Sequence, residues 1–389
     1  MHEKWSFSAA KMVSAFFKLS VRFKSSGVRP MGPLGSRILT SADDIFKFNM
    51  WDHVQWTEED NENARQKAEE NSSLRLPLEE QGKFDTDACQ YWDRFYEVHQ
   101  DKFFKDRRWL FSDFPELFPS LAEERSSNAC RGRHHQAGIS IRSRSTADAE
   151  TGHPQHNDPI QQRRKPDAFN VQEAAQEQNE AATQTLSFPG QHASFRILEV
   201  GCGVGNSVFP IINTIKKTDS FLYCCDFSPC AIQLVKEHPD YDDSVCHAFI
   251  RDICEEAAPF PFPPQSLDVI LAVFVLSSIH PQRIQGVVRR LSAYLKQGGM
   301  FLFRDYGRYD LSQLRFKKGQ CLSENFYARG DGTCAYFFTK DEVQDLFTKA
   351  GLEEVQNLEY RRLQVNRRKR VAMHRVWMQS KYRKPYSPS

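Results

Sequence analysis

After residue 194, short apolar runs alternate with amphipathic stretches. Runs of this length are typical of buried strands, and most of the intervening stretches have helical spacing. Alternation of this kind predicts a mostly parallel α/β sheet with helices on both faces. Two further runs, Leu363–Val365 and Val371–Met378, predict a closing antiparallel hairpin. The predicted strands before the hairpin are Phe195–Val200, Phe221–Cys225, His247–Ile250, Leu267–Phe274 and Met300–Arg304.

A helical and aromatic pattern precedes the predicted sheet. A charged helical stretch over 57–81 leads into a second helix whose apolar residues recur every three or four positions. We expect 41–118 to form an N-terminal cap on a catalytic domain of 194–389. The apolar positions on this second helix are Phe84, Ala88, Tyr91, Trp92, Phe95 and Tyr96.

The segment 119–193 lacks the pattern of a packed domain. Gln, Ser, Arg, His and Ala dominate it up to Ser187, and Phe169 is the one aromatic residue in that part. Such a segment buries too little apolar surface to offset its ordering entropy, so we predict a disordered insert. Up to Ser187 it holds Cys130 and four histidines, which show no recognised ligand spacing, and we therefore predict no metal site.

The first 40 residues are basic and poor in acids, with Glu3 as the single acid. This pattern is typical of a mitochondrial presequence, and Met12 offers an alternative start. A disordered basic tail or an arm that contacts RNA phosphates would have a similar composition. The presequence interpretation predicts a mitochondrial protein, with the cytoplasm or nucleus as the alternatives.

Composition narrows the class of protein. The 389 residues are 40% hydrophobic and 26% charged, which excludes wholesale disorder. The ten cysteines form no CxxC pair, so neither a disulfide scaffold nor a zinc ribbon fits. No apolar run approaches the roughly 20 residues of a membrane span. The net charge of +2 conceals a polarised chain, because residues 360–389 hold ten Lys or Arg and no acid.

A glycine turn supplies the clearest chemical signal. The strand Phe195–Val200 runs directly into Gly201-Cys-Gly-Val-Gly-Asn206. Glycines let the backbone approach a ligand closely, and the next helix N-terminus offers free N–H groups. A dinucleotide fingerprint needs glycine where Asn206 stands, which disfavours a nicotinamide oxidoreductase. The pattern resembles the first motif of S-adenosylmethionine-dependent methyltransferases.

Two acids follow the next two predicted strands. Asp226 ends the second strand, where a carboxylate can accept hydrogen bonds from ribose hydroxyls. Asp252 follows the third strand and is placed to hold an adenine amino group, with Ile253 packed on the ring. The alternatives are that Asp226 caps the helix beginning at Ser228 and that Asp252 starts an acidic turn. The end of the fourth strand, near Val273, is expected to open into the same cleft.

Aromatic and basic residues alternate between Phe303 and Phe338. Stacking faces beside cations suit an unstacked base and its phosphates, although an aromatic subdomain core would show the same pattern. A basic hairpin beside the cleft would follow a phosphate backbone. The candidate RNA-binding residues are Lys105, Arg107, Arg315, Lys317, Lys318, Arg367, Arg368, Lys369 and Arg370.

Several motifs together resemble a known family. The chain is similar to the eukaryotic methyltransferase-like enzymes that make 3-methylcytidine at position 32 of tRNA anticodon loops. The likeness covers 46–118 and 194–384, and the N-terminal tail is most similar to that of the mitochondrially targeted member. The motifs are Tyr91-Trp-Asp-x-Phe-Tyr96, Phe103-Phe-Lys-Asp-Arg107, Leu198-Glu-Val-Gly-Cys-Gly-Val-Gly-Asn206, Cys225-Asp-Phe-Ser228, Phe274-Val-Leu-Ser277, Phe303-Arg-Asp-Tyr-Gly307 and Glu324-Asn-Phe-Tyr327.

The resemblance implies a Rossmann-like class I methyltransferase sheet of seven strands, the last antiparallel, with an N-terminal helical cap. It implies S-adenosyl-L-methionine as cofactor and the anticodon stem-loop of Ser- or Thr-type tRNAs as substrate. An aminoacyl-tRNA synthetase is a further partner that it suggests. The cofactor contacts implied are Trp92, Tyr96, Gly201, Gly203, Asp226, Asp252, Ile253 and Val273.

The chemistry of cytosine N3 needs little acid–base help, because the neutral base attacks the methyl group through an in-plane lone pair. Positioning is expected to supply most of the rate. We expect Asp305 to stabilise the positive charge that develops on the base, with Arg304 and Tyr306 holding the base or a neighbouring phosphate. Two other hypotheses remain open: a protein or small-molecule methyltransferase, and an RNA-binding protein that keeps the fold without activity.

Overall fold

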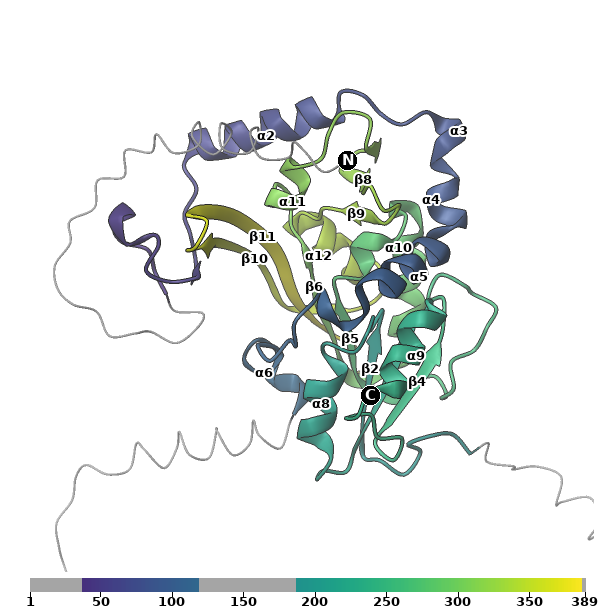
Figure 1. The fold of residues 1–389 in the computed structure, drawn as a ribbon. Helices are drawn as coiled ribbons and strands as arrows, with labels where there is room; N and C mark the ends of the chain where they lie inside the picture. The colour runs from purple at the N-terminus through teal and green to yellow at the C-terminus, as the bar shows by residue number, and fades with distance from the viewer. Residues whose placement is uncertain (1–36, 119–186, 387–389) are drawn as a thin grey trace, which may run out of the picture. The chain divides into compact units, whose positions relative to one another are not determined.

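The computed structural model describes residues 37–118 and 187–386 (Figure 1). The described residues up to 118 and from 188 onward belong to one compact unit. Most of the predicted presequence at 1–40 and of the predicted insert at 119–193 lies outside the described residues, so both stay predictions. The division into a separate cap and catalytic domain stays a prediction as well.

A mixed eight-stranded sheet forms the centre of this unit, with the strand order β1-β10-β11-β6-β5-β2-β3-β4. The strands β4, β3, β2, β5 and β6 pair in parallel, and β11 pairs antiparallel with both β6 and β10. This order confirms the predicted Rossmann-like sheet with a last antiparallel strand, to which β1 adds a short eighth strand. The bounds are β1 Met50–Trp51, β2 Phe195–Val200, β3 Ser220–Asp226, β4 Cys246–Ile250, β5 Leu267–Val273, β6 Leu295–Tyr306, β10 Glu353–Asn366 and β11 Val371–Arg383.

The closing hairpin is longer than the apolar runs predict. β10 pairs with β11 from Glu353↔Arg383 to Asn366↔Val371. β10 buries only Asn357, Arg362, Leu363 and Val365, because much of this antiparallel strand is open to solvent. A strand with so few buried apolar residues and so many charges is not found by a search for apolar runs, so the sequence predicts only Leu363–Val365 of it.

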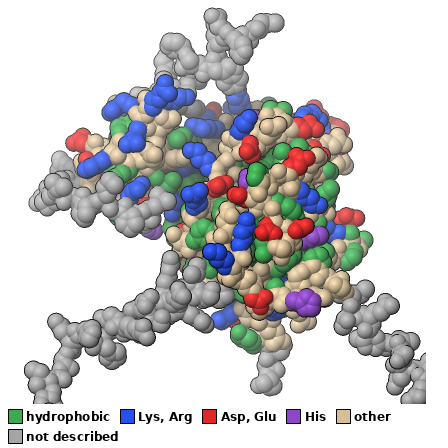
Figure 2. Space-filling view, turned by 60° about the horizontal axis from the view of Figure 1, so that its bottom comes forward, with side chains coloured by type: hydrophobic (Ala, Val, Ile, Leu, Met, Phe, Trp, Pro, Cys, Tyr) green, Lys and Arg blue, Asp and Glu red, His purple; other side chains and the backbone are tan. Residues whose placement is uncertain are grey.

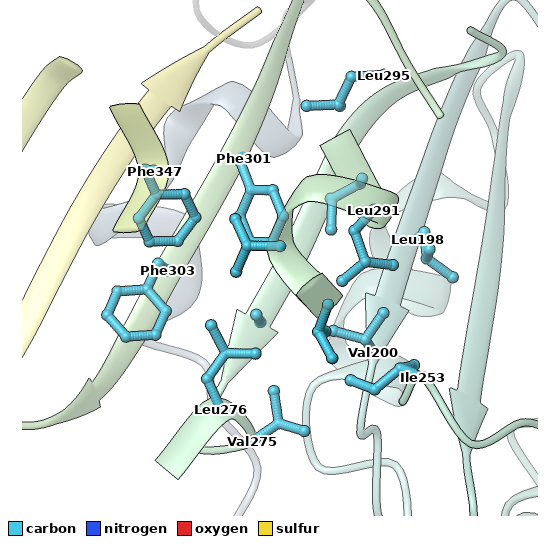
Figure 3. Packing of buried hydrophobic residues seen from close by; sticks show 14 of the residues in the cluster. Leu198, Val200, Ile253, Val275, Leu276, Leu291, Leu295, Phe301, Phe303 and Phe347 are labelled. Carbon is cyan, nitrogen blue, oxygen red and sulfur yellow. The ribbon is translucent and has the colours of Figure 1, made fainter. Parts of the chain in front are cut away.

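Helices cover both faces of the sheet and bury two apolar layers. On one face, Leu291 of α10 and Phe347 of α12 pack with Phe301 and Phe303 of β6 (Figure 3). On the other face, α8 and α9 pack with Ile197 of β2 and with the turn of α6. These layers place the carboxyl ends of the parallel strands at one edge. The bounds are α6 Leu110–Asp113, α8 Val208–Ile215, α9 Pro229–Glu237, η4 Leu276–Ser278, α10 Pro281–Ser292 and α12 Lys340–Thr348.

The N-terminal segment contacts the sheet domain in several places besides α6. α5 packs on α9, and Trp51 of β1 joins a small cluster with Leu363 and Val365 of β10. Asn71 of α2 is buried and donates to the carbonyl of Leu314 in α11 at 3.2 Å. The remaining bounds are η1 Ala42–Asp44, α2 Glu58–Ser72, α3 Leu78–Gln81, α4 Lys83–Thr86, α5 Ala88–His99, η2 Gln100–Lys102, η3 Pro115–Leu117 and α11 Leu311–Leu314.

A small antiparallel sheet, β7-β8-β9, occupies part of the alternating aromatic and basic segment. Phe316, Tyr327 and Phe337 form its buried core, so their rings cannot stack on RNA bases. For these aromatics, the subdomain-core alternative is therefore correct. The strands are β7 Cys321–Ser323, β8 Phe326–Ala328 and β9 Cys334–Tyr336.

Among the described residues, no helix combines the length and apolarity that a membrane span requires. Within the same ranges, no group of three His, Cys, Asp or Glu side chains is arranged to hold a metal ion.

Asp310 connects the loop after β6 to β11 and is fully buried. Its Oδ2 accepts from Arg375 Nε at 2.9 Å and from the amide of Val376 at 2.8 Å, and its Oδ1 accepts from the amide of Ser312 at 2.8 Å. A carboxylate in this position offsets its own burial through several strong hydrogen bonds.

We therefore expect Asp310→Ala to lower the free energy of unfolding by about 3 kcal/mol, because it leaves Arg375 and two amides without their acceptor. Urea unfolding followed by circular dichroism measures the loss. Asp345→Ala is the matched control, since the Asp345–Lys349 ion pair is 68% and 64% exposed and should contribute less than about 1 kcal/mol. Equal losses in the two variants would contradict this role for Asp310.

Candidate active site

A cavity of about 550 Å³ lies where α4, α5 and the turns after β2, β3, β4 and β5 come together. Trp92 and Tyr96 line it from the N-terminal segment, and Gly201, Asp226 and Asp252 line it from the sheet. These five residues were predicted as cofactor contacts from two distant segments of the sequence, and the fold brings them together around one cavity.

The turn after β2 approaches the cavity closely because it is made of glycine. Gly201 has a φ of 60°, and a Cβ there would lie 2.2 Å from Val275 Cγ2. The amide of Gly203 donates to Asp226 Oδ2 at 2.9 Å. Gly203 supports the turn through this bond and is not part of the cavity wall. Space for a ligand at Gly201 therefore depends on the missing side chain.

Asp226 has two functions in this geometry. Its Oδ1 accepts from the amide of Ser228 at 3.0 Å, next to the N-terminus of α9, and its Oδ2 accepts from Gly203. The cap of α9 is Ser228, whose hydroxyl accepts from the amide of Ala231 at 3.1 Å. Asp226 therefore holds the capping residue and does not cap the helix itself, and its side chain lines the cavity. Burial raises the pKa of Asp226 to about 6, although the two amides oppose the shift.

Asp252 and Ile253 follow β4 on the same wall of the cavity. Asp252 Oδ1 accepts from the amide of Cys254 at 2.7 Å, so the alternative of a turn-forming aspartate also holds. Ile253 is 7% exposed and offers an apolar surface. An acid beside an apolar side chain suits the edge and the face of an adenine ring.

Helix α5 forms an aromatic wall opposite the sheet. The rings of Trp92 and Tyr96 lie 5.7 Å apart, and burial raises the pKa of Tyr96 above its usual range. Asp93 fastens this helix to α9, because it accepts from the Ser228 hydroxyl and from the amide of Cys230 at 3.2 Å. Asp93 belongs to the motif Tyr91-Trp-Asp-x-Phe-Tyr96, but the sequence did not predict that it joins α5 to α9.

Val273 does not line the cavity, which corrects its predicted role. Its side chain belongs to the apolar layer with Leu302 and Ile211, because successive strand residues point to opposite faces. The next two residues, Phe274 and Val275, line the cavity instead. Phe274 has a φ of 57°, a conformation that non-glycine residues rarely adopt and that is enriched at functional sites.

Asp305 is fully buried and is not part of the cavity wall. Its Oδ2 accepts from the amide of Ser277 at 2.9 Å, and its Oδ1 accepts from the amide of Tyr306 at 2.9 Å. Burial raises the pKa of Asp305 to about 6. The carboxylate orders η4, which follows Val275 and ends at Ser278, two residues of the wall. The expected direct contact of Asp305 with the base is therefore corrected to a positioning role.

Arg304 is enclosed on the opposite face of the sheet from Asp305. Its guanidinium donates to Asp113 and to Gln379 Oε1 at 2.8 Å, and it lies between the rings of Trp109 and Trp377 at 4.0 and 4.9 Å. The expectation that Arg304 holds the base or a phosphate is therefore corrected, because its hydrogen-bonding groups serve the protein interior.

Tyr306 lies beside the cavity, next to Phe274, where we expect the target base to bind. Its ring lies 5.1 Å from that of Phe274, which lines the cavity, and 5.6 Å from that of Phe337. It is partly exposed, unlike Asp305, and burial of its hydroxyl raises its pKa.

Arg107 is turned inward, which corrects its assignment to an RNA-binding surface. Its Nη1 donates to Ser207 Oγ at 2.9 Å and lies 3.6 Å from Glu199 Oε1. Glu199 is fully buried at the glycine turn, and burial raises its pKa to about 7. Arg107 therefore compensates part of a buried charge beneath the cofactor turn.

The other predicted RNA-binding residues lie on the surface. Lys105, Arg315, Lys317 and Lys318 are exposed, as are residues 367–370 at the tip of the β10–β11 hairpin. Figure 2 shows Lys and Arg side chains gathered on the lobe at the left. The four cations at 367–370 are therefore available to a partner, whereas Arg362, Arg375 and Lys381 of the same basic run are held in ion pairs.

Several wall residues carried no sequence signal. Asp85 of α4 and Arg283 of α10 form an ion pair at 2.8 Å, and both line the cavity, as does Cys89. Isolated residues of these types occur throughout the chain, so only the fold could assemble them.

A class I methyltransferase is the class of protein that this fold and site define. Its sheet, its glycine turn against Asp226 and its acid-and-apolar wall at Asp252 and Ile253 fit the ribose and adenine of S-adenosyl-L-methionine, the cofactor of the chain. A model of the methyltransferase domain matches residues 198–301.

Comparison with curated proteins gives the family. The tRNA N(3)-cytidine methyltransferase METTL2 of Gallus gallus is 47% identical over 368 residues, which cover 92% of this chain and 96% of that protein. METTL2B of Homo sapiens is 47% identical and covers 90% of this chain and 93% of its own length. The mitochondrial METTL8 of Homo sapiens is 46% identical over 66% of this chain and 91% of its own length. The chain belongs to the family of tRNA N(3)-cytidine methyltransferases.

The raised pKa of Asp226 predicts a pH-dependent affinity for S-adenosyl-L-methionine. Ribose hydroxyls need the ionised carboxylate, so we expect affinity to rise up to about pH 6 and then level off, at most tenfold per pH unit. In the ligand-free protein, Asp226 should lower the free energy of unfolding as the pH rises from about 4 to 6, because the folded state retains the proton longer.

Isothermal titration calorimetry between pH 5 and 8 measures this dependence. Asp226→Asn keeps the size of the side chain without its titration, so its affinity should be lower and flatter across the same range. A wild-type affinity that does not change below pH 6 would argue against Asp226 as the ribose acceptor.

Proposed function

We propose that this protein transfers a methyl group from S-adenosyl-L-methionine to N3 of cytidine 32 in the anticodon loop of tRNA. The observation that carries the proposal is the family membership, at 47% identity over 92% of the chain, combined with the cofactor-shaped cavity. The alignment with METTL2 of Gallus gallus covers 96% of that protein, so the likeness includes the cap as well as the sheet.

S-adenosyl-L-methionine supplies an electrophilic methyl group when it is bound. Asp226 and Asp252 would hold its ribose and adenine, and Trp92 and Tyr96 would close over it from α5. Cytosine N3 needs no deprotonation, so orientation of the base is the main task left to the protein. Phe274 and Tyr306, at the ends of β5 and β6, are the aromatic pair that we assign to this task.

N3 lies on the pairing edge of the base, so cytidine 32 has to leave the stack of the loop. Exposed cations at residues 367–370 and at Arg315 and Lys318 would hold the flanking phosphates. We extend the proposal to tRNAs of the Ser and Thr type and to an aminoacyl-tRNA synthetase as partner, both on the resemblance of the motifs.

The experiment combines tRNA, labelled S-adenosyl-L-methionine and two variants, and maps 3-methylcytidine in the product. Asp226→Ala should lose at least 90% of methyl transfer while tRNA affinity stays within about twofold. The second variant should weaken tRNA binding and reduce its salt dependence while cofactor affinity stays unchanged. It replaces Arg367, Arg368, Lys369 and Arg370 by Ala.

The methylation assay is run in parallel with purified Ser tRNA, Thr tRNA and other tRNAs, and the yields of 3-methylcytidine are compared. Methylation of a protein or small molecule in place of tRNA would overturn the proposal, as would tRNA binding without any methyl transfer. Arg383→Ala, at an exposed arginine at the far end of β11 from the hairpin tip, serves as the control for general loss of charge.

For localisation, we propose the mitochondrion, based on the basic, acid-poor composition of residues 1–40 and on the likeness to a mitochondrial relative. A fluorescent protein fused behind residues 1–40 should accumulate in mitochondria. The same fusion with Lys11, Lys18, Arg22 and Lys24 changed to Glu should not, and a diffuse signal from the unmodified fusion would point to the cytoplasm or nucleus.

A further inference from the structure

A second cavity, of about 540 Å³, lies on the other side of α5. Tyr91, Arg94 and Val98 line it from a face of the helix that differs from the one carrying Trp92 and Tyr96 toward the cofactor cavity. Helix geometry explains this division. Tyr91, Arg94 and Val98 are three and four residues apart and share one face, and Trp92 and Tyr96 are four apart and share another. The opposite wall is the turn 329–332 after β8. α5 therefore separates two cavities of similar size.

The second cavity has an unusually apolar and aromatic edge. Phe95 and His99 line it with their rings 4.6 Å apart, and Phe103 packs on both rings at 5.0 and 4.9 Å. Val98 is 71% exposed and Phe103 is 55% exposed. Exposed apolar side chains beside a cavity mark binding surfaces rather than core packing.

Cations surround these stacking faces. Lys83, Arg94 and Arg329 line the cavity, with Asp331 as the single acid on its wall. The Asp331 carboxylate is engaged locally, since its Oδ1 accepts from the amide of Thr333 at 3.0 Å. Lys83 Nζ lies 3.6 Å from Glu80 Oε2, whereas no ion pair within the described ranges involves Arg94 or Arg329. The wall therefore carries an excess of positive charge.

The cavity is adjacent to the predicted reaction centre. Phe84 lines both cavities, and the Arg329 guanidinium lies 6.0 Å from the ring centroid of Tyr306. An RNA strand with one nucleotide at Tyr306 would thus have neighbouring nucleotides within reach of the second cavity. Aromatic faces with adjacent cations are what an unstacked base and its phosphate require.

We propose that this second cavity binds another unpaired nucleotide of the anticodon loop while the target cytidine occupies the site at Phe274 and Tyr306. The inference rests on the proposed function, because it concerns the same RNA. The base would stack beside His99, and Arg94 or Lys83 would contact the phosphate. Stacking of this kind contributes about 1–3 kcal/mol per base, or five- to 150-fold in affinity.

An abasic scan tests the proposal. Wild-type protein is titrated with an anticodon stem-loop RNA that it methylates, and with copies in which each loop nucleotide in turn lacks its base. We expect affinity to fall about tenfold or more at one loop position besides the target. In Arg94→Ala/His99→Ala, the same abasic site should change affinity by less than twofold, whereas the penalty at the target should stay.

Arg383→Ala/Val355→Ala is the matched control, because it removes an exposed cation and a half-exposed valine on the β10–β11 hairpin. Unchanged melting temperature and cofactor affinity verify the fold of each variant. If the first double variant does not fold, Lys83→Glu replaces it, since this exposed position should tolerate the change and the added acid should repel the phosphate.

Two results would overturn the proposal: no sensitive loop position besides the target, or the same abasic penalties in wild type and variant. Either can occur with methylation intact, which would leave the proposed function standing. Absence of methylation in the wild-type protein would instead refute the function itself.

Discussion

The buried carboxylate of Asp226 is the constraint on which the site depends. It accepts from Gly203 in the turn after β2 and from Ser228 at the start of α9, and the Ser228 hydroxyl donates to Asp93 of α5. Three segments that are distant in sequence are thus held in register by one short chain of hydrogen bonds. Removing water from this chain strengthens each bond and also makes an unpaired member costly.

The fold and the cofactor half of the site were largely predictable because their signals are local. Glycines at 201 and 203 and an acid at a strand end, Asp226, have meaning within a few residues of sequence. One predicted cofactor contact, Val273, was placed wrongly, because the direction of a side chain at a strand end cannot be read from the sequence. The cavity is lined by Phe274 and Val275 instead, and a shift of a single position is enough to turn a strand side chain to the other face.

Charged residues near the site show a second limit of sequence reasoning. Arg107, Arg304 and Asp305 were all expected to contact RNA, yet each is committed to a partner inside the protein. A pattern of charges cannot distinguish a side chain that meets a ligand from one that orders a neighbouring turn, because burial decides between them. The hairpin cations at 367–370 were identified correctly as exposed, since their run contains no acid to pair with.

The bond between Asp93 and Ser228 joins residues 135 positions apart. At ribosomal speeds of about 5–20 residues per second, α5 leaves the ribosome roughly 7–27 s before the helix that receives its aromatic face. During that interval Trp92, Phe95 and Tyr96 have no partner on α9. The aromatic residues of α5 are therefore synthesised well before the helix that buries them, and completion of the cofactor site is a late event in folding.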